Sequence, residues 1–280
     1  MIETFSFDVR GDIYRMHRRP NAPHVVVNDD YRGVRVIDPR SGEDYSRVAF
    51  SPDYAASGIV NGWAFSADGD LVATFDDDAQ RGCLLSLAKG TRRVISHPGW
   101  ISTFAMPYDW RDGTLWLHDA ESFSFASIDA STGITTGDDG FRALQENRSW
   151  RRALDRMRRM NAGSVRVEPE LAHSLVIIEG DGKRVGRIGW ADQPDLVVAA
   201  PSGVCRLAAM SENLITLAEY EVRVLSSNGE TLGRHVAPAG FHFLDVETLP
   251  ETSEHPAVIV TLASALDGSR VSRITSYALN

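Results

Sequence analysis

Short apolar stretches alternate with polar turns along the chain, and five of these turns end in glycine. In "VRVIDPRSGE", residues 34–43, an apolar strand pattern meets a polar turn that ends at Gly42. The same order returns at residues 83–90, 125–133, 175–182 and 222–229. Glycine supplies the positive φ that tight hairpin turns require. Each stretch therefore predicts a strand followed by a hairpin turn.

The spacing of these turns predicts a repeat. The glycines lie at positions 42, 90, 133, 182 and 229, so the gaps are 48, 43, 49 and 47 residues. A repeat of about 40–50 residues with several short strands is typical of propeller blades. The second unit is the most complete, with strands expected at 59–66, 71–75, 83–87 and 92–96. The strand before the glycine turn is the third of these four.

Two sequence patterns carry a family resemblance. "WAFSADGDLVATF", residues 63–75, resembles the inner hairpin of WD-type blades, and "VIDPRSGE" and "SIDASTGI" resemble the third-strand turn of YVTN-type and quinoprotein-type blades. The chain therefore resembles the β-propeller superfamily over most of its length. The resemblance implies an all-β fold and no particular activity, because propellers include enzymes and scaffolds alike.

We expect one β-propeller domain over residues 1–280 with six blades, five or seven being the alternatives. The last blade is incomplete, because only 241–246, 257–262 and 271–278 supply strands after the fifth glycine turn. The alternating segment 3–9 can provide its fourth, outer strand and close the ring, which would leave no long free edge.

The fourth unit departs from the repeat. Between residues 141 and 162 the pattern is helical, with Trp150, Leu154 and Met157 at helical spacing and Gly163 at the expected end. Either this helix precedes a three-stranded blade, or the strand count there is wrong. The segment has seven arginines and two acidic residues, a net charge of +5, so the rest of the chain carries −14. It is either an amphipathic helix docked on the ring or a second partner contact. The contact residues would be Arg148, Arg151, Arg152, Arg156 and Arg159.

Acidic residues recur in the loops between second and third strands. In a propeller these connections open on one face, as do the inter-blade loops that contain two tryptophans. Grouped carboxylates attract a basic partner, and tryptophans are frequent binding anchors. The alternative interpretation is that acidic turns serve solubility and backbone geometry, and that the tryptophans are core. The candidate residues are Asp29, Asp30, Asp76, Asp77, Asp78, Trp100, Asp119, Glu121, Trp190, Glu219 and Glu221.

Composition narrows the class of function. The net charge of −9 argues against general nucleic-acid binding, which depends on clustered Lys and Arg. No segment approaches the roughly 18 apolar residues of a membrane helix, and the N-terminus lacks a signal-peptide pattern. The spacing of Cys83 and Cys205 suggests neither a disulfide nor a metal site, so we expect a cytoplasmic protein.

The sequence favours a non-enzymatic module that binds a basic protein partner through its acidic face, with no cofactor and no metal. Catalytic motifs such as a nucleophile elbow or a paired-histidine zinc site are absent. A narrower version is an inhibitor or immunity protein that neutralises a cationic toxin such as a nuclease. The enzymatic alternative is a lactonase-like hydrolase with a metal in the central channel, near Asn61, Asp109, Asn213 and Asp245. The oligomeric state is left open.

Overall fold

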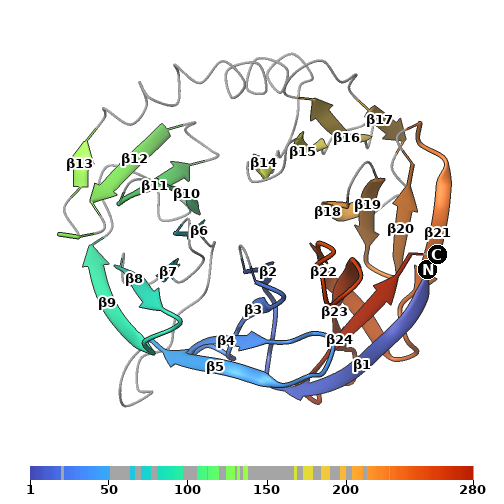
Figure 1. The fold of residues 1–280 in the computed structure, drawn as a ribbon, viewed down its shortest axis with the longest axis horizontal. Helices are drawn as coiled ribbons and strands as arrows, with labels where there is room; N and C mark the ends of the chain where they lie inside the picture. Colours follow the sequence, from blue (N-terminus) through green and yellow to red (C-terminus); the bar gives the residue numbers. More distant parts are fainter. Residues whose placement is uncertain are drawn as a thin grey trace. The chain divides into compact units, whose positions relative to one another are not determined.

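The computed structural model describes residues 1–19, 22–50, 64–66, 71–76, 81–96, 106–111, 113–119, 124–129, 131–132, 135–137, 167–168, 173–178, 184–189, 196–199, 204–210, 213–226 and 228–279. The chain divides into two compact units. Unit 1 contains Met1–Met16, Pro39–Gly42 and Arg148–Asn280, and unit 2 contains His17–Asp38 and Glu43–Asn147. The secondary-structure elements of the described residues are all strands (Figure 1). In this part of the chain, no helix has the length and apolar character that spanning a bilayer requires.

Unit 2 contains three four-stranded sheets, apart from Met16 of β2, which belongs to unit 1. In each sheet the strands follow one another in chain order. The first is β2 (Met16–Arg18), β3 (Val25–Asn28), β4 (Gly33–Ile37) and β5 (Asp44–Ala49). The second is β6 (Ala64–Phe65), β7 (Leu71–Asp76), β8 (Arg81–Ser86) and β9 (Thr91–Ser96). The third is β10 (Met106–Arg111), β11 (Thr114–Asp119), β12 (Ser124–Asp129) and β13 (Thr135–Gly137).

Unit 1 contains the other three sheets. The fourth is β14 (Val167–Glu168), β15 (His173–Ile178), β16 (Arg184–Gly189) and β17 (Leu196–Ala199). The fifth is β18 (Val204–Met210), β19 (Asn213–Ala218), β20 (Glu221–Leu225) and β21 (Thr231–Val236). The sixth is β22 (Phe241–Leu249), β23 (Val258–Ala265), β24 (Val271–Ala278) and β1 (Ile2–Arg10). We call β2, β6, β10, β14, β18 and β22 the first strands, and β5, β9, β13, β17, β21 and β1 the fourth strands.

In the fourth sheet, the prediction that the glycine turn follows the third strand is wrong. The stretch before the glycine turn at 182 matches third strands elsewhere, but here it forms β15, the second strand. The described sheet has four strands, so the three-stranded alternative is also wrong. A glycine-containing polar turn suits any hairpin, so the repeat period alone could not say which hairpin it marks. The predicted helix at 141–162 and most of the predicted strand at 59–66 lie outside the described residues.

Buried β-branched strands form the core of each unit. The three valines of β3 are fully buried, as expected for a strand covered on both faces. In unit 1, one apolar cluster joins the fifth and sixth sheets and includes Val224, Phe243, Ile259 and Tyr277. The two sheets are therefore packed together through side chains from β20, β22, β23 and β24.

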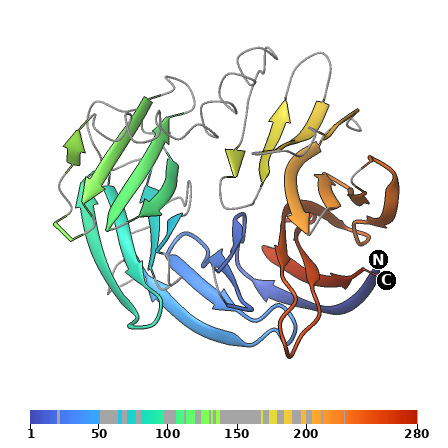
Figure 2. The same cartoon turned by 45° about the horizontal axis from the view of Figure 1, so that its top comes forward.

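The N-terminal strand pairs with the C-terminal one. β1 runs antiparallel to β24 over its whole length, the blue strand beside the red one in Figures 1 and 2. Pro39–Gly42 packs against this pair, because the Ser276 hydroxyl donates a 2.6 Å hydrogen bond to the Pro39 carbonyl. Gly42 has φ +75°, and a Cβ there would lie 3.1 Å from the Phe7 ring. The backbone conformation therefore favours glycine at this position, and a side chain there would also crowd the Phe7 ring.

Three first strands contain the same β-bulge. The register skips one residue in β10, β18 and β22, and the skipped residues are Tyr108, Cys205 and Leu244. A charged residue follows each of them: Asp109, Arg206 and Asp245. A bulge bends its strand and redirects nearby side chains, so in each of these three sheets a charged residue directly follows the bend.

A second bulge recurs in the fourth strands. The skipped residue is Tyr45 in β5, Thr136 in β13 and Leu232 in β21, in each case three residues after the hairpin glycine. Tyr45 is 61% exposed and Leu232 is 54% exposed. The bulge therefore presents large side chains at the outer strands of the first and fifth sheets.

Candidate functional site

The acidic candidates of the described residues lie in or next to second-to-third connections. Asp29 and Asp30 join β3 to β4 in unit 2, and Glu219 precedes β20 in unit 1, in the turn after β19. Asp76 ends β7 and Asp119 ends β11, which are second strands as well. The same topological position thus carries carboxylates in four sheets.

Backbone hydrogen bonds define the β3–β4 connection. The Asp29 amide donates to the Gly33 carbonyl at 2.9 Å, and the Arg32 amide donates to the Asp29 carbonyl at 3.0 Å. Asp30 has φ +56°, a conformation that Asp tolerates better than most residues. The backbone conformation alone is therefore a sufficient reason for an aspartate at position 30, without a binding role for its charge. The connection also holds Tyr31, whose side chain is 38% exposed.

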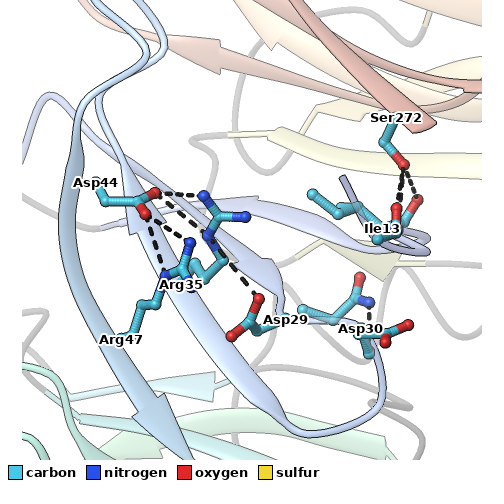
Figure 3. A network of polar contacts seen from close by, with 9 residues as sticks. Ile13, Asp29, Asp30, Arg35, Asp44, Arg47 and Ser272 are labelled. Carbon is cyan, nitrogen blue, oxygen red and sulfur yellow. Dashed lines mark hydrogen bonds and ion pairs between the residues drawn. The ribbon is translucent and has the colours of Figure 1, made fainter. Parts of the chain in front are cut away.

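Two arginines compensate the charges around this connection (Figure 3). The Arg35 guanidinium lies 3.9 Å from Asp29 and 2.6 Å from Asp44, and Arg47 lies 2.8 Å from Asp44. Burial alone would raise the pKa of Asp44, but hydrogen bonds and charge from Arg35 and Arg47 outweigh it and lower that pKa below its ordinary value. The charge of Asp29 is therefore partly balanced within its own sheet.

The turn between β19 and β20 is fixed by bonds to two other segments. The Glu219 carbonyl accepts the Phe243 amide at 2.7 Å, and the Tyr220 carbonyl accepts the Ala237 amide at 3.0 Å. Tyr220 is 47% exposed and Glu219 is exposed. A hydrogen bond to the Glu219 carboxylate raises the pKa of the Tyr220 hydroxyl. The turn therefore presents an exposed tyrosine and carboxylate from a fixed backbone.

Glu221 has a different environment from Glu219. It forms ion pairs with Arg223 and, at 2.6 Å, with Arg234, and its side chain is only 15% exposed. Two guanidinium groups thus neutralise Glu221, which leaves Glu219 as the outward carboxylate of this turn.

Sequence reasoning missed the two tyrosines, Tyr31 and Tyr220. The signal was present, because each stands beside acidic residues in "NDDY" and "EYE". Ten of the candidate residues lie outside the described residues and stay predictions: both tryptophans, three carboxylates and the five arginines. They are Trp100, Trp190, Asp77, Asp78, Glu121, Arg148, Arg151, Arg152, Arg156 and Arg159.

The enzymatic alternative depended on polar residues near the inner strands. Asp245 lies in the first strand β22 and is 2% exposed. Its carboxylate accepts the amides of Met16 at 3.1 Å and Val246 at 3.0 Å, and pairs with Arg206 at 3.3 Å. Both oxygens of Asp245 are thus engaged in joining β18, β22 and the start of β2.

The other residues of that alternative are dispersed. Asp109 lies in the first strand β10, whereas Asn213 begins the second strand β19, and Asn61 lies outside the described residues. Within the described ranges, no three His, Cys, Asp or Glu side chains gather as metal ligands would. The described part of the chain therefore gives the hydrolase alternative no ligand set.

Comparisons with known proteins identify the fold. No protein-family model and no curated protein matches the sequence. Among solved structures, the chain is similar to the Cps50 (Swd1) β-propeller domain of Myceliophteria thermophila, with a TM-score of 0.59, 10% identity and coverage of 99% of both chains. It is also similar to a DUF4221 family member from Bacteroides vulgatus, with a TM-score of 0.57, 11% identity and coverage of 99% of this chain and 97% of that one.

These similarities confirm the class expected from the sequence repeat. The chain has a β-propeller fold, and its described sheets are repeats of one four-stranded unit. At 10–11% identity the likeness concerns the fold alone. The number of blades stays a prediction.

Proposed function

We propose that this chain is a non-enzymatic protein-binding module that takes a basic partner through its acidic second-to-third connections. The observation that carries the proposal is that an exposed tyrosine stands next to carboxylates in the second-to-third connection of two sheets. Tyr31 follows Asp29 and Asp30, and Tyr220 follows Glu219. One such connection lies in each unit, and each is a contact point in its own right.

The chemistry of these side chains suits a Lys- or Arg-rich surface. Tyrosine offers a large apolar ring and a hydroxyl at low entropic cost, and it is enriched among the residues that dominate binding energy. Its ring also attracts cations, and neighbouring carboxylates steer a basic partner toward it. The net charge of −9 favours such an encounter over binding to nucleic acid.

Within this proposal we expect the acidic candidates to differ in their contribution to binding. Glu221 and Asp29 have arginine partners of their own, so they contribute less to a partner's binding than their charge suggests. Glu219 is exposed beside Tyr220 and is the carboxylate on which we expect a basic group to bind.

The test is affinity capture from a lysate of the source cell with the wild type and a Tyr31→Ser/Tyr220→Ser variant, read by quantitative mass spectrometry. We expect a partner that is retained at about 50 mM salt, reduced at about 200 mM and lost with the variant, because surface charge attraction is screened by salt. The matched control is Tyr45→Ser, which removes a tyrosine that is 61% exposed on the fourth strand β5. Equal capture by the double variant and the wild type would contradict the proposal.

A further inference from the structure

Exposed apolar side chains gather around the fourth strand of the fifth sheet. The described residues contain seven exposed large hydrophobic side chains. Leu232 and Val236 lie in β21 and are each 54% exposed, and Tyr220 of the preceding turn is 47% exposed. Exposed apolar residues are ordinary when scattered singly, but a group on one surface marks an interaction site.

Backbone contacts bring these residues together within unit 1. Val236 pairs with Glu221, and the next amide, that of Ala237, donates to the Tyr220 carbonyl. Tyr220 therefore lies at the Val236 end of β21. Leu232 lies four residues back along the strand, about 13 Å away at 3.3 Å per residue.

The N-terminal segment covers the opposite face of β21. A Cβ on Gly233 would lie 3.0 Å from the Met1 Cγ, so the Met1 side chain covers this glycine. Gly233 pairs with Val224, whereas Val236 pairs with Glu221, so Gly233 and Val236 face opposite sides of the sheet. The exposed apolar group therefore consists of Leu232, Val236 and Tyr220, three of the seven exposed large hydrophobic residues.

The charges around β21 determine which partner fits. Arg234 projects between Leu232 and Val236 and is 59% exposed at its side chain, but its guanidinium pairs with Glu221. Exposed carboxylates flank the apolar group, with Glu219 beside Tyr220 and Glu230 two residues before Leu232. The surface is therefore apolar in the middle and acidic at its ends.

The form of the strand argues against simple edge pairing with another sheet. β21 is the last strand in the order of its sheet, so its outer edge has no partner within that sheet. The bulge at Leu232 interrupts the regular strand that edge-to-edge pairing requires, yet it leaves the side chain exposed. A partner would therefore contact side chains rather than extend the ladder.

We infer that Leu232, Val236, Tyr220 and Glu219, together named the β21 surface, form one docking site for a basic amphipathic segment of a partner protein. Apolar side chains of the segment bind Leu232, Val236 and Tyr220, and its Lys or Arg residues bind Glu219. This inference rests on the proposed function, because it extends the β19–β20 connection into a continuous surface and names the partner's chemistry.

The experiment measures binding of three synthetic peptides to the full chain by fluorescence anisotropy at about 0.1 M salt. One peptide is an amphipathic helix of leucine and lysine, the second has glutamate in place of lysine, and the third has serine in place of leucine. The variants are Leu232→Ser/Val236→Ser and Glu219→Gln/Tyr220→Ser. The matched control is Leu266→Ser, because Leu266 is 55% exposed but lies after β23, outside the β21 surface.

We expect the leucine–lysine peptide to bind the wild type and Leu266→Ser equally, and each double variant at least about tenfold more weakly. The other two peptides should bind the wild type at least about tenfold more weakly, since each lacks one half of the required chemistry. Matched urea unfolding midpoints show that the variants are folded.

Each other outcome overturns a separate part of the reasoning. If only Glu219→Gln/Tyr220→Ser weakens binding, the β21 surface is wrong while the proposed function survives. If only Leu232→Ser/Val236→Ser weakens binding, the β19–β20 turn and β21 do not form one site, and the inference is wrong. If all three variants behave alike, both proposals fail. If the wild type sediments as a dimer that Leu232→Ser/Val236→Ser disperses, the occupant is a second copy of this chain and the partner-segment inference is overturned.

Discussion

Replacing Gly33 with alanine should strongly destabilise the first sheet. Gly33 begins β4 and pairs with Ala49 of β5. A Cβ there would lie 2.2 Å from the Val48 carbonyl oxygen and 2.9 Å from the Ala49 Cα. Both atoms belong to the backbone, so no side-chain rotation can relieve the contact, and β4 and β5 would have to separate.

The expected cost follows from the bonds beside this contact. Overpacking costs about 1–3 kcal/mol. The hydrogen bonds from Asp29 to Gly33 and from Phe50 to Arg32 adjoin the site, and each contributes about 1 kcal/mol. Alanine reduces the entropy of the unfolded chain and returns about 0.5–1 kcal/mol. The net loss of unfolding free energy should therefore be about 3 kcal/mol.

The assay is urea unfolding followed by tryptophan fluorescence, with Gly268→Ala as the control. Gly268 has φ +74° and nothing within 4 Å of an added Cβ, so alanine there should cost only about 1 kcal/mol of backbone strain. If Gly33→Ala is no less stable than Gly268→Ala, close approach of the β5 backbone is not the reason for glycine at position 33.

Two further predictions concern unit 1. Asp245→Asn removes the charge that pairs with Arg206 while keeping an oxygen for the Met16 amide, and we expect a loss of about 2–3 kcal/mol. A double-mutant cycle with Arg206→Gln measures the pair, and additive losses would refute the coupling. The second concerns Asp8, whose hydrogen bond to Arg273 is the main cause of its lowered pKa. A lowered pKa adds stability above the unfolded value near 3.9 that disappears as the pH falls through the folded value. Asp8→Asn should therefore flatten the loss of stability below about pH 4 in urea unfolding, and an unchanged acid slope would contradict this.

The strands were largely predictable because burial imposes alternating or continuous apolar runs. The valines of β3 and the alternation of β1 both identify strands from local pattern alone. The pairing of β1 with β24 followed from counting, since the last unit lacked one strand. These inferences needed only the hydrophobic pattern and the repeat length.

Register and exposure were not predictable, for two physical reasons. A bulge adds one residue without changing the character of the strand, so Leu244 and Leu232 look like ordinary strand positions. Which charged side chains form ion pairs depends on distances across strands, and these distances cannot be read from the sequence. From its neighbours in the chain, Glu221 was expected to be an exposed acidic residue, but Arg223 and Arg234 neutralise it. Tyr220 could have been identified from its acidic neighbours, but its exposure required the structure.

Because β1 pairs with β24, the first strand to be synthesised cannot find its partner until almost the whole chain has been made. The Ser6 hydroxyl bonds that of Thr275 at 2.9 Å, across 269 residues of chain. At roughly 5–20 residues per second, the ribosome delivers β24 about 13–54 s after β1. Throughout synthesis the first strand must wait without its partner, and the bulge at Thr4 and the charge of Asp8 lower its tendency to pair wrongly in that interval.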